Sequence, residues 1–446
     1  MLTQTIFSGL AAVALSAGAP AMAQDNRIDT IRSDAPSLAK YGTLGIGVKT
    51  IVLTNPKQLD IVKAKAGEPT PTYDRPLTVE VWYPATPVAD ATGAGQYRAI
   101  TRDGKTEVTL HGKALRDAAP DASSGPYPLL IISHGYPGNR FLLSHLAENL
   151  ASKGYVVASI DHTDSTYSDQ TAFGSTLLNR PLDQLFVLNE MGKLNAGAPG
   201  DAIKGALKGM VNADNTGLIG YSMGGYGLVN AIGGGFAASI VGNPIAPPNG
   251  VLAARQAGNP AHTASIDKRI KAAVAFAPWG WNRGFWDAAG LAGIKTPVLF
   301  VAGSVDDVSG YSPGVRNIYE GIVNAPRYLL TFENANHNAG APMPAPRESY
   351  EPVEGLDFIA AEHYFDAVWD NVRMNNIAQH FTTAYFGKML KGDAGMDRYL
   401  ALVEMAEDGV ADRDAAGKST AADTYWQGFP LRSAIGLRLE DRKSVV

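Results

Sequence analysis

The feature that most constrains the fold is a series of short, uninterrupted apolar runs in the middle of the chain. These runs lie at 129–132, 156–160, 217–219, 272–276, 298–301 and 328–331. Strands wetted on one face alternate apolar and polar residues, whereas continuous runs suit strands buried on both faces of a parallel sheet. Helical patterns separate the runs, at 141–153, 182–195, 224–232 and 315–323. The alternation predicts an α/β fold, with helices on both faces of a mostly parallel, doubly wound sheet and a site at the carboxyl ends of its strands.

The remaining segments add edge strands and insertions to this core. Residues 48–53 and 77–83 alternate in polarity, which predicts antiparallel N-terminal strands. A polar insertion at about 86–125 is expected to form a surface loop with a small hairpin around Glu107–Leu110. A second insertion, 236–266, is either a cap near the site or a surface loop. Residues 364–385 have a helical pattern rich in aromatics, and we expect one domain over 41–440 after a loose lead-in at 24–40.

The N-terminus carries a targeting signal. No side chain is charged before Asp25, residues 6–17 are apolar or small, and Ala21-Met22-Ala23 has the small-x-small pattern of a cleavage site. We expect a signal peptide at 1–23, cleaved near Ala23, and export to a periplasm or beyond. A disordered or membrane-anchoring tail is the alternative. No later run reaches the roughly 18 uncharged apolar residues of a membrane span, so no stable span is expected.

Composition excludes several classes of site. The chain has no cysteine, which rules out disulfides, thiolate nucleophiles and zinc–thiolate sites. The formal net charge is −5, without the basic stripe of a nucleic-acid-binding protein. No H-x-x-x-H motif or cluster of Asp and His with ligand spacing stands out, so no metal site is expected.

The strongest local motif is Gly220-Tyr221-Ser222-Met223-Gly224, directly after the apolar run 217–219. A G-x-S-x-G between a buried strand and a helix places the serine on a sharp, exposed turn. Glycines flank it because side chains would clash at that turn. The motif predicts Ser222 as a nucleophile.

A serine nucleophile needs a base and an acid. His337 lies just beyond the last predicted core strand, where this architecture delivers the base. His162, after Ile160-Asp161 at another strand end, is the rival base or a hydrogen-bonded residue of the pocket wall. The acid follows the run 298–301 as Asp306, with its neighbour Asp307 as the alternative. The chain order Ser, Asp, His is typical of α/β-hydrolases.

The oxyanion that forms during attack needs backbone donors. One is expected from Met223, next to the nucleophile, and the other from Tyr136 in the loop 133–138, of which His134 is a part. Pro137 has no N–H and cannot serve. The candidates for the pocket wall are Tyr221, His162, Trp279 and Trp281. The two tryptophans could instead pack beneath a lid.

Several segments together resemble a known family. They are 133–140 (SHGYPGNR), 150–157, Asp161-His162, 81–85 (VWYPA), 180–183 (RPLD) and 426–429. These segments are similar to platelet-activating-factor acetylhydrolases and to the secreted bacterial predicted dienelactone hydrolases, over most of 41–440. The resemblance implies an α/β-hydrolase fold and a serine hydrolase that acts on esters without a cofactor, with Ser222, Asp306 and His337 as its triad. Dienelactone hydrolase itself uses a cysteine, which this chain lacks, so lactone specificity is not implied.

The function expected from these features is hydrolysis of a small-molecule or polymeric carboxylic ester through an acyl-enzyme. Cleavage of an amide or peptide bond by the same triad is one alternative. A non-catalytic binding protein that retains the fold is the other.

Overall fold

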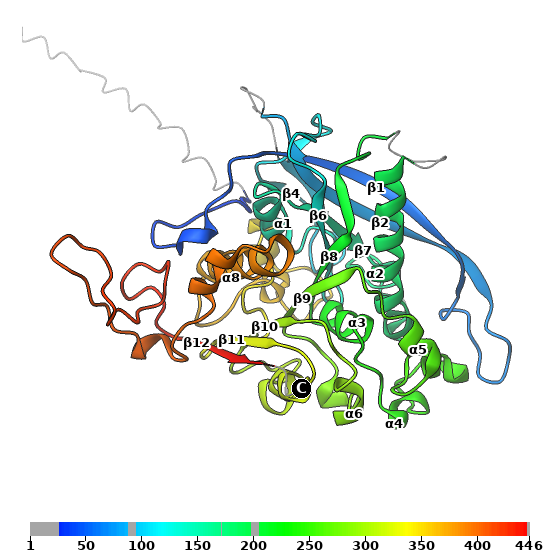
Figure 1. Cartoon of the computed structure of the whole chain (residues 1–446). Coiled ribbons are helices and arrows are strands. Elements are labelled where there is room, and N and C mark those ends of the chain that lie inside the picture. Colours follow the sequence, from blue (N-terminus) through cyan, green and yellow to red (C-terminus); the bar gives the residue numbers. More distant parts are fainter. Residues whose placement is uncertain (1–25, 88–94, 171, 198–204, 444–446) are drawn as a thin grey trace, which may run out of the picture.

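The computed structural model describes residues 26–87, 95–170, 172–197 and 205–443, so the predicted signal peptide lies outside the described residues. Its centre is a ten-stranded sheet (Figure 1). In spatial order the strands are β12 (Leu437–Arg442), β11 (Arg327–Phe332), β10 (Val298–Gly303), β9 (Ile270–Phe276), β8 (Val211–Tyr221), β6 (Tyr127–Ser133), β7 (Val156–Asp161), β2 (Thr72–Ala85), β1 (Gly45–Leu59) and β5 (Leu115–Arg116). Neighbours from β7 to β11 pair in parallel, whereas β12, β2 and β1 add antiparallel edges. The predicted mostly parallel sheet with antiparallel N-terminal strands is confirmed.

Helices cover both faces of this sheet (Figure 1). On one face lie α1 (Ser144–Ala151) and α8 (Asn371–Lys391), and on the other lie α2 (Phe173–Ala196), α3 (Met223–Ala231) and α7 (Arg316–Gly321). Alternate strand residues supply the two cores: Leu130 and Ile132 pack toward α1 and α8, while Leu129 and Ile131 pack toward α2 and α3. The core strands are therefore apolar at every position because both of their faces are buried.

The connections of the central strands determine where a site can form. From β6 the chain moves to β7 on one side and then returns to β8 on the other side of β6. In open α/β sheets, the crevice outside the carboxyl ends at such a reversal is the usual ligand site. The loop after β6 and the turn after β8 flank this crevice, and they contain the predicted oxyanion loop and Ser222.

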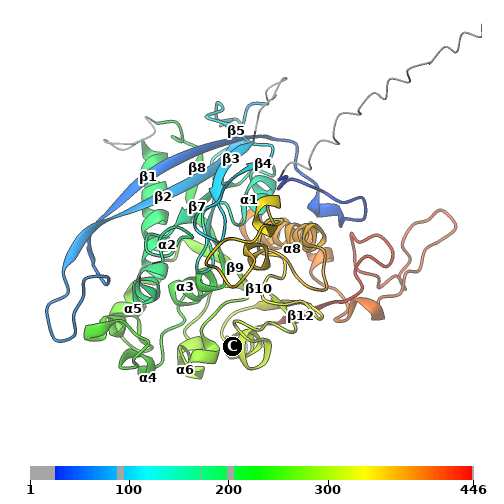
Figure 2. The same ribbon diagram turned by 180° about the vertical axis from the view of Figure 1, so that it is seen from behind.

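Outside the core, the two N-terminal strands form a long antiparallel hairpin along the edge of the sheet (Figure 2). The insertion after it contains β3 (Gln96–Ile100) paired with β4 (Glu107–His111), close to the expected hairpin. Short helices α4 (Ala238–Val241), α5 (Pro260–Ala264) and α6 (Ala288–Leu291) lie between β8 and β10. Short 3₁₀ turns occur at Ser37–Ala39, Pro248–Arg255, Trp281–Arg283, Arg347–Tyr350, Ala360–His363, Ala394–Tyr399 and Ala406–Asp408.

The lead-in is packed rather than loose from residue 26 onward. Its backbone N–H groups find acceptors on two distant elements: Ile28 donates to the carbonyl of His111 (2.9 Å), and Arg32 and Leu38 donate to Asn376 and His380 on α8 (2.9 and 3.2 Å). Ile28 and Ala39 are buried. The composition of the segment did not reveal these long-range partners.

Several elements differ from the sequence-based prediction. Helix α2 begins at Phe173 rather than at 182, and it includes Pro181 in its interior. Helix α8 begins at Asn371 rather than at 364, because the side chain of Asp370 caps it by accepting a bond from the Arg373 N–H. The short edge strand β12 was not predicted. No helix in the described ranges is both long and apolar enough to cross a membrane.

Candidate active site

Ser222 occupies a strained turn between β8 and α3. Its backbone has φ 54° and ψ −114°, in the region that non-glycine residues rarely adopt. The two motif glycines permit the turn: a Cβ on Gly220 would overlap the carbonyl of Gly224, and a Cβ on Gly224 would overlap the carbonyl of Ser133 at the end of β6. The start of α3 is therefore seated directly against the neighbouring strand.

The predicted oxyanion loop lies against this turn. A Cβ built on Gly135 would be 3.4 Å from the Cβ of Ser222. Met223 is the first residue of α3, so its N–H has no acceptor within the helix. The two predicted donors, Met223 and Tyr136, thus come from segments that meet beside Ser222.

His337 is paired with Asp306. Its Nδ1 lies 3.0 Å from both carboxylate oxygens, and both side chains are buried. The Asp306 Oδ1 also accepts the N–H groups of Val308 (2.9 Å) and Ser309 (2.8 Å). Burial alone would raise the pKa of Asp306, but its net pKa is lowered by His337 and by these two N–H groups, so the carboxylate is ionised. Asp307, the alternative acid, is exposed.

Ser222 and His337 line the same cavity. Its volume is about 460 Å³, and its lining residues are Gly135, Tyr136, Tyr221, Ser222, Asp307, Val308, Asn336, His337, Asn338, Glu362, His363 and Phe365. Tyr221, a predicted pocket residue, is part of this wall, and so is Tyr136, the predicted oxyanion donor. The segment 336–365, which follows the last parallel strand, supplies half of this wall.

Asn338 was not predicted from the sequence. Its Oδ1 accepts a bond from the Tyr221 hydroxyl (2.8 Å), and its Nδ2 donates to the carbonyls of Glu362 (3.0 Å) and Phe365 (2.7 Å). The Tyr221 ring lies 5.2 Å from the His337 ring, centroid to centroid. Asn338 thus ties the wall segment 336–365 to Tyr221, the residue beside the nucleophile. Its position next to His337 was the only sequence signal available.

Three other expected wall residues lie outside this lining. The Trp279 ring packs against the rings of Phe173 (5.6 Å) and Phe285 (5.4 Å). Phe173 in turn contacts Tyr136, so it lies between Trp279 and the cavity wall. Trp281 is half-buried. His162 is fully buried and hydrogen-bonded, which matches the alternative of a structural histidine rather than a second base. No residue of 236–266, the candidate cap, lines the cavity. That insertion instead reaches the β1–β2 hairpin, where Asn249 donates to the carbonyls of Lys65 and Glu68.

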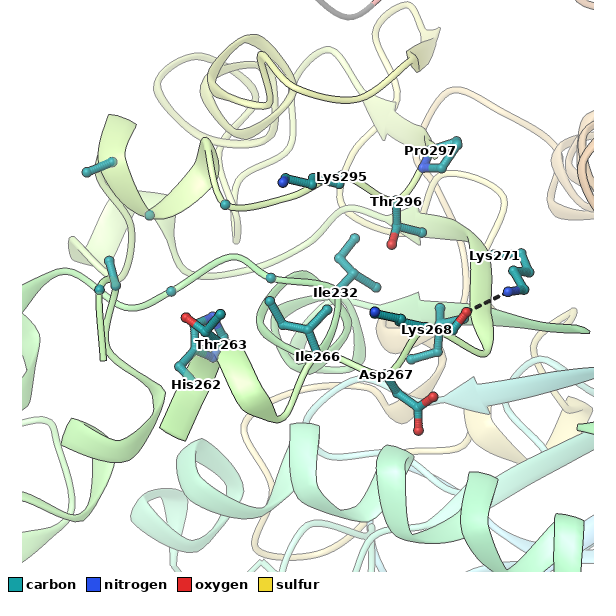
Figure 3. A pocket seen from close by; sticks show the side chains of 18 residues that line it. Ile232, His262, Thr263, Ile266, Asp267, Lys268, Lys271, Lys295, Thr296 and Pro297 are labelled. Atoms are coloured by element: carbon teal, nitrogen blue, oxygen red, sulfur yellow. Dashed lines mark hydrogen bonds between the residues drawn. The ribbon is translucent and has the colours of Figure 1, made fainter. Parts of the chain in front are cut away.

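A larger cavity of about 610 Å³ lies at the opposite edge of the sheet (Figure 3). Ile270 at the start of β9 and Pro297 just before β10 belong to its wall, along with Lys268, Lys271 and Lys295. Its lining contains no serine, and its single histidine, His262, has no hydrogen-bonded carboxylate among the described residues. The smaller cavity is therefore the better candidate for chemistry. Over the described ranges, no three His, Asp or Glu side chains group as a metal site.

Comparisons with known proteins agree with this architecture. The family model for platelet-activating factor acetylhydrolase, isoform II, matches residues 95–184, which include the predicted oxyanion loop. A solved ferulic acid esterase from Streptomyces cinnamoneus superposes with a TM-score of 0.56 at 21% identity, covering 80% of this chain and 94% of the esterase. The chain has the α/β-hydrolase fold.

Within this α/β-hydrolase fold, sequence similarity extends to cutinases. Cutinase est1 of Thermobifida alba is 24% identical over 214 residues, 48% of this chain and 54% of that enzyme. Cutinase cut1 of Thermobifida fusca is 22% identical over 214 residues, 48% of this chain and 50% of that enzyme. The chain spans about half the length of these relatives.

Proposed function

We propose that this protein is a serine hydrolase that cleaves a carboxylic ester through Ser222, His337 and Asp306. The observation that carries the proposal is that His337, which lines the same cavity as Ser222, is paired with the buried, ionised carboxylate of Asp306. A neutral imidazole held in this way has its Nε2 free to accept the serine proton. The relatives named as cutinases and as a ferulic acid esterase support an ester as the bond cleaved.

The proposed reaction has two steps. His337 accepts the proton of Ser222 as its Oγ attacks the ester carbonyl, and the N–H groups of Met223 and Tyr136 bind the oxyanion. The alcohol leaves with the proton held by His337, which gives an acyl-enzyme. Water, activated by the same histidine, then releases the acid and restores Ser222.

The cavity favours a compact, uncharged substrate. Its volume of about 460 Å³ is suited to a small ester, or to one segment of a polymeric ester. Two exposed carboxylate residues, Asp307 and Glu362, line it, so an anionic substrate would be repelled. We also propose, from residues 1–23 alone, that the enzyme is exported.

Substitution of the nucleophile tests the proposal. Ser222→Ala should reduce turnover of p-nitrophenyl esters by about 10⁵-fold or more and abolish labelling by a fluorophosphonate probe. Ser168→Ala, at an exposed serine outside the cavity, is the matched control. Wild-type-level turnover or labelling in Ser222→Ala would contradict the assignment.

A substrate panel separates the remaining alternatives. Esters of graded acyl length should be compared with matched amides on the wild-type enzyme. Faster turnover of the amide would favour the peptidase alternative. A wild-type chain that reacts with no serine-directed probe would favour a binding protein.

A further inference from the structure

A second Ser-His-Asp relay lies buried behind the catalytic cavity. The Ser133 hydroxyl, at the end of β6, lies 2.8 Å from His162 Nε2, and His162 Nδ1 lies 2.9 Å from the Asp183 carboxylate. Arg75 from β2 binds both oxygens of that carboxylate, at 2.9 and 3.0 Å. Ser133, His162 and Asp183 are completely buried. Because no substrate can reach the Ser133 hydroxyl, this relay is an anchor rather than a second active site.

The protonation states in the relay are consistent with an anchor. Burial lowers the pKa of His162 to about 3, so its imidazole is neutral and donates from Nδ1 to Asp183 while Nε2 accepts from Ser133. Burial alone would raise the pKa of Asp183, but Arg75 and His162 lower it overall, so it is ionised. Every group in the chain of bonds has a partner, which makes the end of β6 rigid.

The loop that follows β6 is held by the same helix, α2. Arg180, one turn before Asp183, donates to the carbonyls of His134 and Gly135 and to the Ser165 hydroxyl, the last two at 2.8 and 2.6 Å. His134 Nδ1 also lies 2.7 Å from the Gly135 carbonyl, while its Nε2 accepts the His162 N–H at 3.3 Å. Two donors therefore hold the Gly135 carbonyl on the buried side of the loop.

The geometry of one peptide bond connects these hydrogen bonds from Arg180 and His134 to catalysis. The Gly135–Tyr136 peptide is trans, and in a planar trans peptide the C=O and the N–H point in opposite directions. Arg180 is 1% exposed and does not line the cavity, whereas Tyr136 does. Since the Gly135 carbonyl is bonded to Arg180, the Tyr136 N–H points away from Arg180, and Tyr136 lines the cavity that also contains Ser222.

We infer that Arg180 is a positioning residue of the oxyanion hole: it holds the Gly135–Tyr136 peptide so that the Tyr136 N–H faces Ser222. The inference rests on the proposed ester hydrolysis. The guanidinium contributes a second effect. Burial lowers the pKa of Arg180 to about 9, so it is still charged at neutral pH, and a cation on the carbonyl side polarises the peptide and strengthens its N–H as a donor. No carboxylate hydrogen-bonds to Arg180 among the described residues, and two of its hydrogen bonds go to carbonyls of the loop.

The test compares an ester with its thionoester, in which sulfur replaces the carbonyl oxygen. Sulfur is a weak hydrogen-bond acceptor, so the preference for oxygen reports the strength of the oxyanion donors. Arg180→Met should lower kcat for the oxygen ester by about 10²-fold, in the range for loss of one donor, with KM little changed. Its preference for oxygen over sulfur should fall by about tenfold or more. Arg180→Lys should lie between Met and wild type, because lysine keeps the charge but lacks the planar fork.

Arg255→Met is the matched control. Arg255 is also buried, its pKa is lowered to about 10 by burial, and it donates to a serine hydroxyl, Ser265, away from the cavity. It should leave the oxygen-to-sulfur preference unchanged. If Arg180→Met is not folded by circular dichroism, Arg180→Lys provides the same comparison.

The inference is overturned if the Arg180→Met preference for oxygen equals that of the wild type, whether kcat falls equally on both esters or does not fall at all. Either result in an enzyme whose wild type is active leaves the proposed function intact. A wild type that hydrolyses neither ester contradicts the proposed function itself.

Discussion

At the scale of single residues, adjacent side chains have very different environments. Asp306 and Asp307 are neighbours with identical chemistry, yet the first is 6% exposed and hydrogen-bonded to His337 while the second is exposed at the cavity. The N–H groups of Val308 and Ser309 bind one oxygen of Asp306 and hold its side chain toward the imidazole. The local turn therefore selects which carboxylate meets the histidine.

This difference predicts unequal effects of two matched substitutions. Asp306→Asn should lower kcat by about 10⁴-fold, because an amide in place of the carboxylate stabilises the wrong histidine tautomer and cannot stabilise the imidazolium. Asp307→Asn should keep kcat for a neutral ester within the same order of magnitude as the wild type. Steady-state kinetics on one p-nitrophenyl ester checks both, and a larger loss in Asp307→Asn would reverse the assignment of the acid.

At the scale of elements, α2 organises the region behind the site. It supplies Arg180 and Asp183 to the two buried networks, although Pro181 lies between them. A proline inside a helix cannot donate to the carbonyl four residues earlier, here that of Leu177. The Tyr226 hydroxyl from α3 donates to this carbonyl at 2.9 Å. The helix therefore continues through the proline because another element satisfies the freed group.

A double-mutant cycle tests this compensation. Tyr226→Phe should lower the free energy of unfolding by about 1–3 kcal/mol, because the Leu177 carbonyl is left buried and unpaired. Pro181→Ala restores a backbone donor within the helix, so it should recover part of that loss in the Tyr226→Phe background. Urea unfolding of the wild type, the two single variants and the double variant measures the coupling between the two positions. Strictly additive changes in the free energy of unfolding would argue against the compensation.

At the scale of the whole molecule, burial of histidines links folding to pH. Burial lowers the pKa of His145, His162 and His380 to about 3, well below the ordinary value of 6.5. The unfolded chain therefore binds more protons than the folded one between pH 6.5 and 3. The contribution of these neutral histidines to the free energy of unfolding is complete above pH 6.5 and is lost as the pH falls toward 3.

His145 isolates one part of this effect. It is 1% exposed, and neither ring nitrogen has a hydrogen-bond partner in the part of the chain that the structure describes. Below pH 6.5 the free energy of unfolding of the wild type falls as the pH is lowered, and His145→Leu should reduce this slope by up to about 1.4 kcal/mol per pH unit. At pH 7.5 the substitution should change the free energy of unfolding little. Urea unfolding at pH 7.5, 6, 5 and 4.5 checks this, and a variant profile parallel to the wild type at every pH would contradict it.

Local patterns in the amino-acid sequence were sufficient to predict several features of this protein. Continuous apolar runs predicted the parallel strands because residues buried on both faces leave no alternation. The G-x-S-x-G motif predicted a turn at Ser222, and β8 ends at Tyr221 while α3 begins at Met223. The side chains of His337 and the two aspartates were expected near Ser222 because parallel strands bring their carboxyl ends to one edge of the sheet.

Which of those side chains meet, and what surrounds them, depends on contacts between segments that are distant in the chain. The choice of Asp306, the burial of His162, the packing of residues 26–40 and the cavity wall from 336–365 each depend on partners remote in the chain. So do the hydrogen bonds of Arg180 to the carbonyls of His134 and Gly135, which join residues about 45 positions apart. Local patterns specify period and turn chemistry, whereas hydrogen bonds between distant segments are determined by how the layers pack.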